Sequence, residues 1–138
     1  MRPIMRSLPI LLAVALWAAA CDDQEAAGAS EAEVAEFRAA VDGLCQTEAF
    51  AQLEQYSSAR QTFADQSHQY LHDVAARLQD QDPDITGTLL EAKQQVETGL
   101  KDPAFYGTKE LVRRLVALQE ALGRAGAVLG LPEAGCGA

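Results

Sequence analysis

Apolar residues recur every three to four positions between residues 30 and 130, and this spacing constrains the fold more than any other feature. Val34, Phe37, Val41 and Leu44, for example, fall at i, i+3, i+7 and i+10, which places them on one face of a helix. No segment shows the period-two alternation of a half-buried strand. The sequence therefore predicts an all-α fold, a small antiparallel bundle of four to five helices in a domain spanning residues 30–130.

Capping residues and helix breakers divide this domain into predicted elements. Ser30 and Glu33 form a capping box, Gly43 and the residues after it suggest a break, and Gly130 followed by Pro132 marks a stop. Residues 101–107, which include Pro103, read as a loop. The predicted helices cover residues 30–44, a short segment 47–57 capped by Thr47, 58–81 opened by Ser58, 84–100 capped by Asp84, and 108–129.

The charge is acidic and unevenly distributed. The 138 residues include 20 acidic and 11 basic side chains, a net charge of -9, which excludes nucleic-acid binding driven by overall charge. Residues 22–84 hold 14 acidic and 3 basic residues, whereas residues 85–138 hold six of each. The acidic half could face a basic protein partner such as a cationic toxin or enzyme. The interpretation that we favour is a solvated surface that keeps the protein soluble.

The first twenty residues have the pattern of a secretory signal peptide. Arg2 and Arg6 precede an uncharged segment from Leu8 to Ala20, and the chain turns polar directly after Cys21. The sequence Ala18-Ala19-Ala20-Cys21 resembles the lipobox of bacterial lipoproteins. Ala18 departs from the leucine usual there, and the same residues fit the small-x-small rule of ordinary signal peptidase, so a simply secreted protein is the alternative.

The lipoprotein resemblance implies removal of residues 1–20, lipidation of Cys21 by diacylglycerol and a further acyl chain such as palmitate, and anchoring in a membrane of the cell envelope. Residues 21–29 would then be the lipidated cysteine and a flexible, acidic tether. In Gram-negative sorting, Asp22 resembles an inner-membrane retention signal. If the host is Gram-negative, the resemblance therefore places the protein on the periplasmic face of the inner membrane.

With Cys21 lipidated, Cys45 and Cys136 remain as a pair. An even pair in an exported domain predicts a disulfide, here between the first helix and the tail formed by residues 131–138. Two free thiols are the alternative. A disulfide favours a topology in which segment 47–57 folds back on the first helix, because this brings the end of the last helix to the end where Cys45 lies.

His68 and His72 are four residues apart on a predicted helix, and Asp65 lies one turn earlier. Two imidazoles at this spacing can share a metal ion. A helical wheel drawn at 100° per residue points all three side chains away from the apolar stripe. Ordinary surface histidines are therefore the preferred interpretation, and a metal or small-ligand site is the alternative.

Phe105 and Tyr106 lie in the predicted 101–107 loop, where exposed rings can anchor a protein partner or cap the open end of the bundle. The chain has no nucleophile elbow, P-loop or zinc-protease motif, so we predict neither an enzyme nor a cofactor. The function most consistent with the sequence is a membrane-anchored protein-binding or adaptor module. The alternatives are a metal or small-ligand binder and an acidic inhibitor or immunity-type lipoprotein.

Overall fold

The computed structural model describes residues 28–137, and the predicted signal peptide and Cys21 lie outside this range. The described residues form helices joined by short turns and contain no strand, which confirms the all-α prediction. The elements are α1 (Glu31–Gln52), α2 (Tyr56–Phe63), the π-helix η1 (Ala64–His68), α3 (Gln69–Leu78), α4 (Pro83–Lys101), α5 (Pro103–Tyr106) and α6 (Thr108–Val128).

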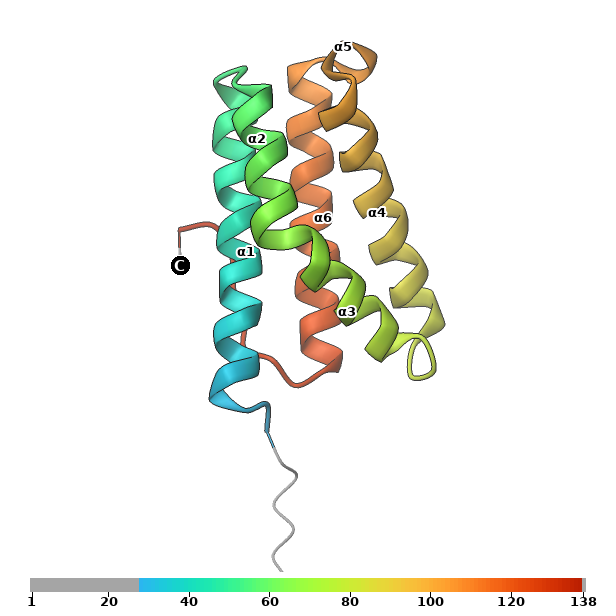
Figure 1. Ribbon diagram of the computed structural model, residues 1–138. Coiled ribbons are helices and arrows are strands. Elements are labelled where there is room, and N and C mark those ends of the chain that lie inside the picture. Colours follow the sequence, from blue (N-terminus) through green and yellow to red (C-terminus); the bar gives the residue numbers. More distant parts are fainter. Residues whose placement is uncertain (1–27, 138) are drawn as a thin grey trace, which may run out of the picture.

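The α2, η1 and α3 segments follow one another without a break, so the described chain forms five helices, of which only α5 is shorter than seven residues. Neighbouring long helices run antiparallel: the chain passes along α1, returns through α2–η1–α3, rises again in α4, crosses over in α5 and descends in α6 (Figure 1). Helix α6 packs against both α1 and α4. This arrangement places α5 and the α1–α2 turn at one end, opposite the end where residue 28 enters.

The core consists mainly of leucines supplied by every long helix. In the last helix the apolar face predicted by periodicity is buried except for its final residue, Leu129, which is half-buried; the buried members are Leu111, Leu115, Leu118, Leu122 and Ala125. Burial of such aliphatic side chains drives folding, at roughly 25 cal/mol per Å² of apolar surface. The largest fully buried side chains are Phe37, Leu44, Leu71, Leu78, Leu89, Leu100, Leu111, Leu115, Leu118, Leu122, Val74 and Val96.

The predicted break near Gly43 is wrong, because α1 continues through it to Gln52. Gly43 is instead the point where η1 approaches α1: a Cβ atom there would lie 2.5 Å from Ser67 Oγ. Thr47 does not cap a new helix either, since its hydroxyl donates back to the Gly43 carbonyl at 2.7 Å. The predicted fold-back of segment 47–57 therefore does not occur.

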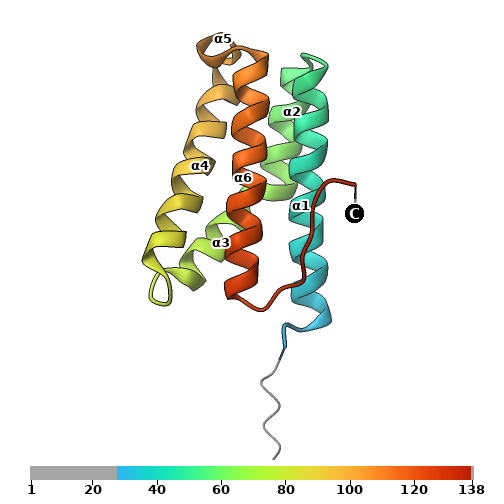
Figure 2. The same ribbon diagram turned by 180° about the vertical axis from the view of Figure 1, so that it is seen from behind.

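The chain brings its two cysteines together in a different way. Helix α6 ends beside the start of α1, and the C-terminal tail then runs back along α1 to the middle of that helix (Figure 2). There Cys136 is bonded to Cys45, which confirms the predicted disulfide. The connection therefore depends on the direction of the tail and not on an additional helical reversal.

Several predicted helix ends are also displaced. The second helix begins at Tyr56 without a side-chain cap, not at Ser58. Asp82, not Asp84, caps α4, because its Oδ1 accepts the Ile85 amide at 3.0 Å and Pro83 fits the first helical position. The predicted 101–107 loop contains the short helix α5, which also starts with a proline.

The start of α1 and the end of α6 lie where the sequence predicts them. The capping box of Ser30 and Glu33 is present at the start of α1. At the end of α6, Gly130 adopts a φ of 71°, and the Leu131 amide donates to the Gly126 carbonyl at 2.9 Å. This geometry is a Schellman stop, which favours glycine because an L side chain is strained at positive φ.

Candidate functional site

The π-helix η1 turns His68 toward α4. A π turn includes one residue more than an α turn, so residues after it are rotated relative to a regular helix. Phe63, Ser67 and Leu71, spaced by four, consequently share the buried face, and the Ser67 hydroxyl donates to the Ala40 carbonyl at 2.8 Å. Because the helical wheel assumed a uniform 100° per residue, it placed His68 too far from the interior.

His68 belongs to a small charged cluster with two residues of α4. Its Nε2 lies 2.9 Å from Glu97 Oε1, and the same oxygen accepts from Nζ of Lys93 at 2.6 Å. The Lys93 side chain is almost fully buried, so this carboxylate compensates a charge that water cannot reach. The His68 contact connects η1 to α4, whereas the Lys93 contact lies within α4.

The predicted metal ligands are only partly brought together. The rings of His68 and His72 lie edge to face with centroids 4.8 Å apart, whereas Asp65 and His72 are exposed. Within residues 28–137, no group of three or more His, Cys, Asp or Glu side chains is placed to hold a metal ion. Lys93 and Glu97 escaped the sequence analysis because their spacing of four on an amphipathic helix is also that of a common surface ion pair.

The α5 end of the bundle presents an aromatic pair. Phe105 is 66% exposed, although it is one of the largest apolar side chains of the domain. Its ring packs edge to face on Tyr106 with centroids 4.8 Å apart, and the Arg114 guanidinium lies 5.0 Å from the Tyr106 ring centroid. The Phe105 ring is therefore supported by Tyr106 on one side and open to solvent on the other.

Close packing on α4 fixes the position of Tyr106, the supporting ring of this pair. A Cβ atom at Gly99 would lie 2.8 Å from Cδ2 of Tyr106, so only glycine leaves room for the tyrosine ring. Gly107, with a φ of 74°, then turns the chain from α5 into α6. The two aromatic residues that the sequence analysis selected thus have distinct positions: Tyr106 packs on α4, and Phe105 projects.

The α1–α2 turn lies at the same end and contributes a second exposed apolar side chain. Leu53 is 67% exposed, the largest value among the bulky apolar residues that the structure describes. The hydroxyls of Tyr56 and Thr108 are 2.6 Å apart, and the Thr108 hydroxyl also donates to Glu54 at 3.2 Å. These bonds join the turn to the start of α6. Leu53 was not singled out from the sequence, because it falls inside the predicted 47–57 helix.

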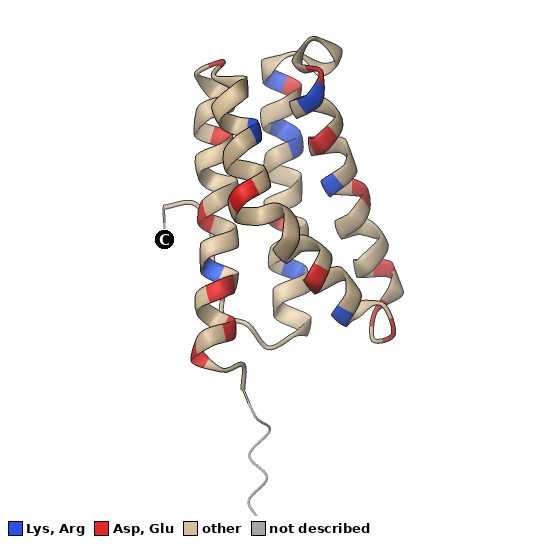
Figure 3. Cartoon of the chain, in the orientation of Figure 1, with Lys and Arg blue, Asp and Glu red and all other residues tan. Residues whose placement is uncertain are grey.

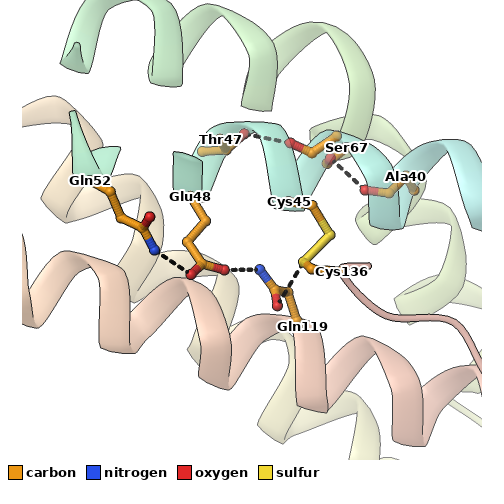
Figure 4. The surroundings of a disulfide bond; sticks show 9 residues. Ala40, Cys45, Thr47, Glu48, Gln52, Ser67, Gln119 and Cys136 are labelled. Atoms are coloured by element: carbon orange, nitrogen blue, oxygen red, sulfur yellow. Dashed lines mark hydrogen bonds between the residues drawn. A yellow bond between two sulfur atoms is a disulfide. The ribbon is translucent and has the colours of Figure 1, made fainter. Parts of the chain in front are cut away.

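The disulfide lies between α1 and α6 (Figure 4). Next to it, Gln119 of α6 donates from Nε2 to Glu48 of α1 at 2.8 Å, and Glu48 also accepts from Gln52 at 2.8 Å. Oε1 of Gln119 lies 3.3 Å from Sγ of Cys136. The sulfur bridge is thus bordered by a polar chain that connects the two helices.

Two ionisable side chains have shifted pKa values, and they lie on α1 and α3. Hydrogen bonds from the backbone and hydroxyl of Ser30, together with Arg77, lower the pKa of Glu33. Burial raises the pKa of Tyr70, whose hydroxyl has no partner in the described part of the chain and whose ring packs near Phe37. The Glu33 shift arises mainly from the capping box at the start of α1, and the Tyr70 shift arises from burial on α3.

Comparisons with protein-family models, with curated proteins and with solved structures found no match to this chain. Among the helices in residues 28–137, none is both long and apolar enough to cross a membrane. The predicted lipidation of Cys21 falls outside the described residues.

Proposed function

We propose that this chain is a lipid-anchored envelope protein whose helical bundle binds a protein partner without catalysing a reaction. The contact surface is the apical surface, defined here as Leu53 and Phe105 with the α1–α2 turn and α5, which carry them. The observation that carries this proposal is the 66% exposure of Phe105 on a support built from Tyr106, Gly99 and Arg114. Supported aromatic side chains are frequent anchors of protein interfaces.

The position of the apical surface fits an anchored protein. Residue 28 enters at one end of the bundle and α5 lies at the other (Figure 1). Helix α1, with 22 residues, is about 33 Å long at 1.5 Å per residue. A lipid on Cys21 and a short tether would therefore present Phe105 well away from the membrane surface.

The acidic inhibitor remains a second candidate, because one specific feature favours it. Of the nine acidic residues between positions 31 and 80, only Glu33 forms an ion pair in the described structure, with Arg77 at 3.0 Å. Figure 3 shows these acidic positions distributed over α1, α2–η1–α3 and the turn that follows. Uncompensated negative charge would attract a basic partner in a salt-dependent manner.

Site-specific photocrosslinking in native membranes tests the proposal. A photoreactive amino acid at position 105 is expected to capture a protein, and mass spectrometry identifies it. The affinity of that protein for the purified bundle is then measured with the Phe105→Ala variant. Loss of an aromatic anchor should weaken binding by about tenfold or more.

The matched control is Leu90→Ala, which removes a side chain that is 39% exposed on the flank of α4. This variant should bind like the wild type. Equal binding by the Phe105→Ala variant would exclude the apical surface, and a steep loss of affinity with salt would favour the acidic candidate instead. Intact mass spectrometry tests the anchor separately: a native protein that retains residues 1–20 would contradict it.

A further inference from the structure

The C-terminal segment 131–137, called the strap below, is attached to the bundle at two points. At its beginning, Leu131 is buried, and its amide completes the stop of α6 on Gly126. Near its end, Cys136 is bonded to Cys45. Between these points no backbone–backbone hydrogen bond joins strap residues 132–135 to the described helices, and Ala134 packs against the core.

The strap lies over the seam between α1 and α6 without filling it. A hollow of about 610 Å³ separates the strap from α6, where Gly123, Arg124 and Ala127 line it. A second hollow of about 340 Å³ separates the strap from α1, where Arg38, Val41 and Asp42 line it. Strap residues 133–135 line both hollows, so the strap forms a wall that the two hollows share.

The two cysteines differ in exposure. Cys136 is exposed, whereas Cys45 is half-buried on α1. Disulfide exchange requires a thiolate to approach one sulfur in line with the bond, so the accessible sulfur is attacked first.

We propose that the strap is released by thiol–disulfide exchange, and that Cys136 Sγ is the atom that the incoming thiolate attacks. The bond between the two cysteines breaks, a mixed disulfide forms on Cys136, and Cys45 leaves as a thiolate that takes up a proton. A second thiol then attacks the mixed disulfide, which yields a free Cys136 thiol and an oxidised reductant. The helices remain in place, and the two hollows lose the wall that they share.

This inference does not depend on the proposed function, because it uses only the contacts of the strap. Reduced glutathione, used as the probe on the folded full-length mature protein, should form its first adduct on Cys136. After acid quenching and trypsin digestion, the adduct is expected on the peptide 125–138 and not on the peptide 39–60. A first adduct on Cys45, or a bond that reacts only in denaturant, would overturn the proposal.

Hydrogen exchange measures the release itself. On reduction with dithiothreitol, the Leu131 amide, which donates to the Gly126 carbonyl at the beginning of the strap, should exchange about tenfold faster, whereas α1 and the rest of α6 should change little. The Cys45→Ser/Cys136→Ser variant should show the same fast exchange without any reductant. If this variant does not fold, the reduced wild-type protein still provides the measurement. Unchanged strap exchange, or loss of protection throughout α1 and α6, would contradict a selective release.

Discussion

At Gly43, a single hydrogen atom decides how closely two helices pack. A Cβ atom at this position would meet Ser67 Oγ at 2.5 Å and Gln66 Cβ at 2.6 Å, both closer than van der Waals contact allows. In contrast, a Cβ atom at Gly87 of α4 would meet nothing within 4 Å. The two glycines are both helical, so they separate the effect of packing from the effect of helix propensity.

Gly43→Ala should destabilise the protein, whereas Gly87→Ala should stabilise it. Overpacking against Ser67 and Gln66 costs about 1–3 kcal/mol, which exceeds the gain of about 1 kcal/mol from replacing a helical glycine. At Gly87 only that gain remains. Urea unfolding followed by circular dichroism gives both free energies of unfolding. Equal shifts of the same sign in the two variants would mean that the close approach at Gly43 is absent.

The same residue shows why local sequence interpretation fails at contacts. A glycine inside a helical pattern signals either a break or a close approach, and its neighbours Leu44 and Val41 fit both. The choice depends on Ser67, which is more than twenty residues away. Phe105 differs, because its position beside two helix-breaking residues, Pro103 and Gly107, already indicated a turn at the surface.

At the scale of the elements, the start of α1 is connected to α3 by Glu33. This side chain accepts from the Ser30 amide at 2.8 Å and from Arg77 at 3.0 Å. These donors favour the charged carboxylate, which lowers the pKa of Glu33 from its ordinary value of 4.5. Its contribution to stability is therefore present above that value and is lost as the pH falls through the lowered pKa.

Glu33→Gln should lower the urea midpoint at pH 7 and have a smaller effect in acid. Glutamine keeps an acceptor for the capping box but loses the charge that attracts Arg77. The difference in urea midpoint between wild type and variant should become smaller as the pH falls below the ordinary glutamate pKa of 4.5. Glu31→Gln, in the same helical turn, serves as the control. A difference in urea midpoint that stays constant from pH 7 to pH 3 would argue against a role of the carboxylate charge.

Apolar periodicity predicts the buried faces of some helices better than those of others. The apolar stripe of α6 recurs at regular α-helical spacing, so both its buried face and its end at Gly130 could be predicted. In the α2–η1–α3 helix, the regular wheel fails at η1, because the π turn inserts a residue in order to seat Ser67 on α1. The cluster of His68 with Lys93 and Glu97 could not be predicted for the same reason.

At the scale of the whole molecule, the disulfide joins residues 91 apart, from the middle of α1 to the tail. A crosslink of this span restricts the unfolded chain much more than the folded one. In the chain-entropy account, a loop of this length contributes roughly 4 kcal/mol. A domain of this size has a total stability of about 5–15 kcal/mol, so the helices can persist without the crosslink.

The Cys45→Ser/Cys136→Ser variant should remain helical but unfold at lower urea concentration. We expect its free energy of unfolding to fall by roughly 4 kcal/mol, because the unfolded chain regains its loop entropy. Far-ultraviolet circular dichroism measures the helix content, and urea titration measures the stability. A loss of helix content in buffer would show that the bundle requires the crosslink, and an unchanged stability would show that the crosslink constrains little.

The sequence by itself determined the all-α class, the core stripes, the outer ends of α1 and α6 and the pairing of Cys45 with Cys136, because these depend on local periodicity, capping chemistry and cysteine count. The tertiary structure decided that α1 runs through Gly43, that η1 turns His68 toward Glu97, and that the tail doubles back along α1. It also decided that Tyr106 is packed while Phe105 is exposed. Each of these outcomes depends on contacts between residues distant in sequence, which no local pattern specifies.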